Sequence, residues 1–226
     1  MYNLVLGVVF VIVNFGLFLL CYRMFGRMGL YAWVGFATVL ANLQVVKTIE
    51  MFGLVMTLGN TIYASIYLTS DLLNEKYGEK AAKKAVWFGF FTLIATTIIM
   101  QLVLRFQPTE TDIAQPSLVT LFELMPQLAL GSLSAYLLSQ LVDVKLYSWL
   151  KKKCPRPDQL WIRNNGSTLV SQLLDSLTFC TIAFWGLYPF HIWLEILVTT
   201  YLIKFVVSAA STPVLYIARR MKVAEE

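Results

Sequence analysis

Seven long apolar runs follow one another along the chain, and this pattern constrains the fold more than any other feature. They cover about 2–22, 30–47, 51–70, 85–106, 118–149, 165–187 and 190–217. A helix of about 20 apolar residues crosses a bilayer. Only 14% of the residues are charged, against roughly a quarter in a soluble domain. We therefore expect an all-α integral membrane protein, a bundle of seven transmembrane helices.

The fifth run is longer than a bilayer requires, and it contains Pro126. Proline interrupts a helix interior because it lacks a backbone N–H. We therefore predict a span over about 127–148, preceded by a separate interfacial piece.

Lysine and arginine residues are concentrated in alternate connections, after the first, third, fifth and seventh runs. Because cytoplasmic loops are enriched in these residues, the N-terminus is predicted outside and the C-terminus in the cytoplasm. The same asymmetry accounts for the formal net charge of +5, so we expect no nucleic-acid partner. The predicted environment is the plasma membrane, which the chain crosses several times.

Five ionisable residues fall inside the predicted spans, where each costs a few kcal/mol unless it has a partner or reaches water. Asp143, Lys145 and Glu195 lie near enough to span ends for snorkelling. Asp175 and Lys204 lie near the midplane of consecutive helices, which predicts an ion pair facing the bundle. A functional role and a purely structural pair are both compatible with this pattern, since buried pairs are weak evidence for stability.

The pattern S-Q-L-x-D occurs twice, at Ser139–Asp143 and at Ser171–Asp175, on helices expected to run in opposite directions. Glutamine and aspartate three residues apart share a helical face. The two faces are predicted to form a polar pocket with Gln140 and Gln172 as further hydrogen-bonding groups. Inverted repeats around a midplane site are typical of transporters.

Three other residues are candidates for the same pocket. Asn42 and Gln44 end the second run, where the alternative role is hydrogen bonding between helices. Phe179 follows Asp175 by one helical turn and is suited to stacking on a planar ligand. Core packing is the alternative for Phe179.

Several ordered segments together resemble one known family. They are Ser70–Gly78, Ser139–Val144, Ser167–Leu169, Asp175–Leu177, Ile182–Trp185, and Trp193–Ile196 with Lys204. Over about 30–217 the chain is similar to the vitamin-uptake-like family of queuosine precursor transporters. On this comparison, residues 1–28 are an additional N-terminal helix and residues 29–226 a six-helix transporter core.

The resemblance implies import of a 7-deazaguanine, the cyano or aminomethyl precursor of the tRNA nucleoside queuosine. Asp175 or Asp143 would then accept the N–H and amino groups of the guanine-like edge. Lys204 would hold the carbonyl or neutralise the remaining carboxylate. The predicted substrate-binding residues are Asn42, Gln44, Gln140, Asp143, Gln172, Asp175, Phe179 and Lys204. The predicted cytoplasmic exit or gate consists of Asp71, Asn74 and Glu75.

Two other functions remain open at the level of sequence. The chain could be the substrate-binding subunit of an ATPase-driven uptake complex, or a membrane scaffold that transports nothing. Enzyme activity is not expected, because the phosphate-binding loop, the zinc-protease motif and the nucleophile elbow are all absent from the sequence. No cofactor or metal is expected, the expected ligand is a small purine-like molecule, and a homodimer is left open.

Overall fold

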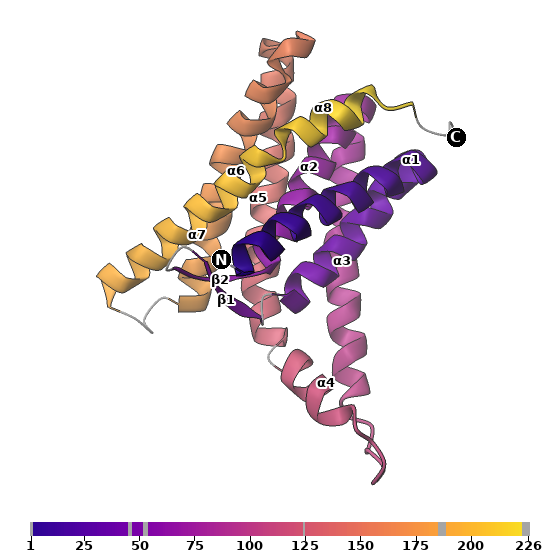
Figure 1. Ribbon diagram of the computed structural model, residues 1–226, viewed down its shortest axis with the longest axis vertical. Helices are drawn as coiled ribbons and strands as arrows, with labels where there is room; N and C mark the ends of the chain where they lie inside the picture. Colours follow the sequence, from indigo (N-terminus) through magenta and orange to yellow (C-terminus); the bar gives the residue numbers. More distant parts are fainter. Residues whose placement is uncertain (1, 45–46, 52–53, 124, 185–188, 223–226) are drawn as a thin grey trace.

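The computed structural model describes residues 2–44, 47–51, 54–123, 125–184 and 189–222. Helices dominate the fold, and Figure 1 shows them as a bundle. The helices are α1 (Tyr2–Gln44), α2 (Gly59–Tyr77), α3 (Glu79–Val103), α4 (Gln115–Phe122), α5 (Met125–Lys153), α6 (Leu160–Phe184), α7 (Phe190–Ala210) and α8 (Thr212–Arg220). A short 3₁₀ turn, Pro157–Gln159, precedes α6, and β1 (Thr48–Met51) and β2 (Leu54–Thr57) lie between α1 and α2.

Helix α1 contains the first two predicted helices, joined through a kink. Gly26 has φ 53° and ψ −134° there, a conformation that glycine reaches easily because it has no Cβ. The second arm turns back from the kink and leads to the strands (Figure 1).

The predicted start of the third helix, at about residue 51, was wrong. Strands β1 and β2 pair in antiparallel fashion, with Thr48 opposite Thr57, and helix α2 begins only at Gly59. The segment is rich in β-branched residues such as Ile49 and Val55, which pack well on a pleated surface. Among the described residues, the regular structure is thus helical apart from these two strands.

Two other helix boundaries follow the sequence more closely. Helix α2 continues past its apolar run to Tyr77 and ends at Gly78, whose φ of 85° and ψ of 171° separate it from α3. The prediction of a separate piece before the fifth span is confirmed, because α4 and α5 are distinct helices; its position at the membrane interface stays a prediction.

The helices pack in two overlapping groups. Helix α1 lies against α2 and α3, whereas α5 and α6 form the most extensive helix pair, with α3 beside α5 and α7 beside α6 and α2. Apolar side chains fill the first group, including Phe18, Leu30 and Ile66. The interior between α2, α5 and α6 is instead rich in buried polar residues.

Helix α6 is polar inside and apolar outside. Its exposed residues include Leu169, Leu173 and Leu177, while Gln172 and Asp175 are buried. A soluble helix has the opposite arrangement. Three helical segments in the described part of the chain are long and apolar enough to cross a membrane, namely Val5–Gln44, Glu79–Val103 and Phe190–Arg220.

Candidate functional site

Polar residues form one stripe on each of α2, α5 and α6, at spacings of three or four residues. We call these stripes the polar column: Tyr63, Tyr67, Asp71 and Glu75 on α2; Gln140, Asp143, Tyr147 and Lys151 on α5; Asn164, Thr168, Gln172 and Asp175 on α6. Residues at this spacing share a helical face. Along α2 the column is about 18 Å long, at a rise of 1.5 Å per residue.

One end of the polar column is the ion pair between Asp175 and Lys204. Lys204 Nζ lies 2.6 Å from Asp175 Oδ2. The hydroxyl groups of Tyr63 and Ser139 donate to Asp175 Oδ1 at 3.0 and 3.1 Å. The predicted ion pair between consecutive helices is therefore confirmed, and both carboxylate oxygens have donors.

Aromatic rings surround the ammonium of this pair. Lys204 Nζ lies 5.2 Å from the centroid of the Tyr63 ring and 5.8 Å from that of Phe179, within the range of cation–π attraction. Tyr63 was not among the predicted binding residues. The four-residue spacing from Tyr63 through Tyr67 to Asp71 is the signal that could have identified it.

The two S-Q-L-x-D motifs are bonded to each other across the helix pair. Ser139 Oγ of α5 donates to Asp175, and Ser171 Oγ of α6 donates to Asp143 Oδ1 at 2.8 Å. Because α5 and α6 run in opposite directions, the serine of each motif lies beside the aspartate of the other. The predicted meeting of the two polar faces is confirmed, whereas their role in binding stays a prediction.

In the middle of the column, Asp71 of α2 and Asp143 of α5 are two buried carboxyl groups whose charges repel each other. Asn164 Nδ2 donates to Asp71 Oδ2, and Thr212 Oγ1 donates to Asn164 Oδ1 at 2.8 Å. The expectation that Asp143 reaches water was wrong, because its side chain is fully buried. Helix packing decides this, since α6 covers the face that carries Asp143.

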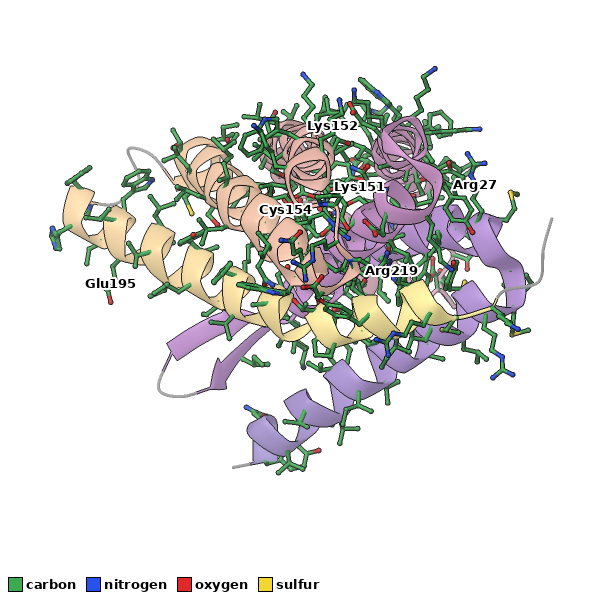
Figure 2. The ribbon with its side chains drawn as sticks, turned by 90° about the horizontal axis from the view of Figure 1, so that it is seen from above. Arg27, Lys151, Lys152, Cys154, Glu195 and Arg219 are labelled. Atoms are coloured by element: carbon green, nitrogen blue, oxygen red, sulfur yellow. The ribbon has the colours of Figure 1, made fainter. Side chains whose placement is uncertain are left out.

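Lys145 and Glu195, the other two residues expected to snorkel, are exposed. Figure 2 shows Glu195 projecting from the outer side of α7.

Several buried polar atoms of this region have no hydrogen-bond partner among the described residues. They include both side-chain polar atoms of Gln140 and of Gln172, together with Asp71 Oδ1, Asp143 Oδ2, Thr168 Oγ1 and Ser176 Oγ. An unsatisfied buried group costs about 1–3 kcal/mol. Such a concentration in one place is typical of a binding site, where a ligand supplies the missing partners.

The other end of the column is a cluster of charges around Glu75. Arg163 Nη2 and Arg219 Nε lie 2.8 and 3.1 Å from Glu75 Oε1. Tyr147 donates to Oε2 at 3.1 Å, and Lys151 Nζ lies 3.8 Å from the same atom. Figure 2 shows Lys151 and Arg219 close to the middle of the bundle.

Arg163 is one of the basic residues in the connection predicted after the fifth run, but the structure places it within α6 and not in a loop. Its side chain is fully buried within α6, and it also donates to the backbone oxygens of Cys154 and Arg156 at 2.6 and 3.0 Å. No local pattern could have shown this, because the partner Glu75 lies 88 positions away.

Asn74, a predicted gate residue, joins α2 to α5. Its Nδ2 donates to Val144 O and to Ser148 Oγ, both at 3.0 Å. Lys151 Nζ donates to the backbone oxygens of Asn74 and Glu75 at 2.9 and 2.6 Å. These contacts hold the end of α2 against α5.

Asn42 and Gln44 lie on α1, a different helix from those that carry the polar column. Asn42 Nδ2 donates to Thr38 O of its own helix at 2.9 Å. Both residues end α1, which packs against α2 and α3. Within the described ranges, no hydrogen bond connects either residue to the polar column.

The described residues contain no group of three or more His, Cys, Asp or Glu side chains suited to a metal ion. The chemistry available in and beside the column is hydrogen bonding by carboxylates, amides and hydroxyls, together with the Lys204 ammonium beside aromatic rings. These are groups that can recognise a planar polar molecule without reacting with it.

Comparison with known proteins agrees with this chemistry. A family model described as "Putative vitamin uptake transporter" matches residues 57–218. A protein of Bacillus subtilis (strain 168) named "Probable queuosine precursor transporter" is 52% identical over 221 residues, covering 98% of this chain and 96% of its own length. The "Queuosine precursor transporter" of Escherichia coli (strain K12) is 25% identical over 173 residues, 74% of each chain.

No solved structure matches this chain at a significant level. The family model covers most of the chain, and the Bacillus relative is similar over nearly its whole length. This multi-pass membrane protein therefore belongs to the family of vitamin uptake transporters that includes the queuosine precursor transporters.

Proposed function

We propose that this chain is a queuosine precursor transporter that imports a 7-deazaguanine base across the plasma membrane. The names of the two relatives support the substrate class. The observation that carries the proposal is the buried polar column, in which Gln140 and Gln172 have no hydrogen-bond partner within the described part of the chain. A ligand with several donors and acceptors supplies what these amides lack.

In the proposed topology the seven apolar runs of the sequence each provide one crossing of the membrane. The N-terminus is outside and the C-terminus is in the cytoplasm. Residues 1–28 add one helix to the core of residues 29–226. Contacts between predicted cytoplasmic segments support this topology, because Lys76 Nζ donates to Tyr22 OH at 2.6 Å and to Met221 O at 3.1 Å. The ends of three different runs therefore meet at one side of the bundle.

Asp175 is the proposed partner of the guanine-like edge, whose N–H and amino groups one carboxylate can accept together. When the base binds, Lys204 turns from Asp175 to the carbonyl of the base. Tyr63 and Phe179 flank the ammonium and offer faces on which a planar base can stack. Gln140 and Gln172 complete the hydrogen bonds.

Asp143 was the other carboxylate considered for this role. The contact between its carboxyl group and that of Asp71 favours Asp175 as the ligand-binding group. Aromatic contacts beside Lys204 point to the same end of the column.

The test is exchange of labelled for unlabelled 7-cyano-7-deazaguanine by the purified chain in proteoliposomes. The wild type should exchange the base, and Asp175→Asn should not. Glu195→Gln is the matched control, because Glu195 is an exposed acid on α7 and its neutralisation should leave exchange unchanged. Wild-type exchange by Asp175→Asn would refute the assignment.

The same preparation separates the alternative functions. A subunit of an ATPase-driven complex should bind the base but fail to move it without its partner. A scaffold should show no increase in melting temperature with any 7-deazaguanine or purine, because only a ligand that binds the folded state stabilises it.

A further inference from the structure

The Asp71–Asp143 pair has a feature that the substrate site does not use. Both side chains are almost fully buried, at 1% and 0% exposure. One oxygen of each has a donor, from Asn164 to Asp71 Oδ2 and from Ser171 to Asp143 Oδ1. The other two oxygens, Asp71 Oδ1 and Asp143 Oδ2, have no donor among the described residues, although the two carboxyl groups interact.

Two buried carboxylates in contact repel each other strongly unless they share a proton. One proton between the two groups supplies a donor and removes one negative charge. Across the described ranges, no lysine or arginine forms an ion pair with Asp71 or Asp143. The pair therefore depends on a proton for its neutralisation.

Other ionisable groups near the pair are already engaged. Those facing it or lying next to it are Tyr67 and Glu75 on α2, Tyr147 and Lys151 on α5, Arg163 on α6 and Arg219 on α8. The three cations contact Glu75. Tyr67 donates to Ser139, and Tyr147 donates to Glu75.

The pair also lies between two groups of helices. Asp71 belongs to α2, which packs with α1 and α3, whereas Asp143 belongs to α5, the partner of α6. A movement of α2 relative to α5 and α6 would separate the two carboxyl groups. Separated carboxyl groups in contact with water both ionise, so such a movement would release the proton.

We propose that Asp71 and Asp143 form a proton-binding site that couples import of the substrate to the proton gradient. This inference rests on the proposed transport function. One proton enters from the outside, is shared by the two carboxyl groups, and leaves to the cytoplasm as the helices separate. Each cycle then carries one proton and one molecule of base inward.

The test compares two assays on the same proteoliposomes with labelled 7-cyano-7-deazaguanine. In the first, inside and outside have equal pH and exchange is measured. In the second, the outside is about one pH unit more acidic, and accumulation should rise up to about tenfold because a tenfold proton ratio drives a tenfold ratio of coupled substrate. A protonophore should abolish this rise.

Asp71→Asn is the informative variant, because an amide can donate one N–H to Asp143 and so imitates the protonated pair. It should lose the response to the pH gradient while exchange at equal pH is still measurable. Asp143→Asn is the second variant, in case the first does not fold. Glu79→Gln is the matched control: Glu79 pairs with Lys83 on the surface, and the gradient response should persist.

The outcomes distinguish the two levels of inference. Exchange by the wild type without any response to the gradient overturns the proton site and leaves the transport function intact. A gradient response that persists in Asp71→Asn and Asp143→Asn also overturns it. Absence of exchange by the wild type instead overturns the transport function on which the inference rests.

Discussion

The two S-Q-L-x-D motifs have the same sequence pattern and the same type of bond across the helix pair, yet their aspartates have different surroundings. Asp175 is neutralised by Lys204 at 2.6 Å. Asp143 instead meets the carboxyl group of Asp71. A local motif therefore sets the position of a carboxylate, while the neighbouring helix decides how its charge is balanced. The surroundings of Asp175 and those of Asp143 should respond differently to substitution.

The largest effect is expected when the Lys204 ammonium is removed from its ion pair with Asp175. Lys204→Met leaves Asp175 buried without a cation, which should lower the free energy of unfolding by about 3–5 kcal/mol. Thermal denaturation of the purified protein in detergent measures this loss of stability. Lys145→Met is the control, since Lys145 is exposed. Equal melting temperatures of the two variants would contradict the importance of the ion pair.

Replacing the unpartnered amides should have the opposite effect on stability. Gln140→Leu and Gln172→Leu each remove unsatisfied buried atoms and should raise the free energy of unfolding by about 1–3 kcal/mol. Both should also weaken binding of the 7-deazaguanine, measured by equilibrium binding to purified protein. A variant that is destabilised and still binds normally would show that the amide has a structural role.

The pair of Asp71 and Asp143 should make the stability of the folded protein depend on pH. If the folded state holds a proton that the unfolded state releases, wild-type stability falls as the pH rises, by about 1.4 kcal/mol per pH unit for one proton. Asp143→Asn should flatten this dependence between about pH 6 and pH 8, where free aspartates in the unfolded chain are ionised. Melting temperatures across that range provide the measurement. Parallel curves for variant and wild type would argue against a shared proton.

The smallest effect is expected when an ion pair on the surface is removed. Glu79 and Lys83 lie 2.5 Å apart with side chains more than a third exposed, and such pairs contribute at most about 0.5 kcal/mol. Lys83→Ala should therefore change the melting temperature little and substrate exchange not at all. A large fall in melting temperature or in exchange would mean that burial does not explain why the buried charges matter more than this exposed pair.

Much of the helical framework was predictable because its signals are local. Apolar runs of span length and a proline within the fifth run indicated most helices. The wrong prediction over residues 51–57 concerned a short apolar segment, where periodicity alone does not distinguish a strand from a helix. The pair of Asp175 and Lys204 was predictable because opposite charges at one depth on consecutive helices have little alternative to meeting.

The candidate site was only partly predictable. Gln140, Gln172 and the two aspartates were identified from their repeated pattern. Tyr63 was missed because its signal, the four-residue spacing to Tyr67 and Asp71, does not stand out among the many aromatic residues of the chain. Asn42 and Gln44 looked similar to the other amides in the sequence. Within the described residues, no hydrogen bond joins them to the polar column. This depends on how α1 packs, which no pattern within α1 records.

Neighbouring residues and their periodicity are enough to show that this chain is helical and suited to a membrane, and which faces of its helices are polar. The burial of Arg163 against Glu75 and the approach of Asp71 to Asp143 instead depend on how the helices pack. These contacts join residues 88 and 72 positions apart in the chain. They form only when separate helices pack and exclude water, so the packing of α2 against α5 and α6 determines the charge balance of the site.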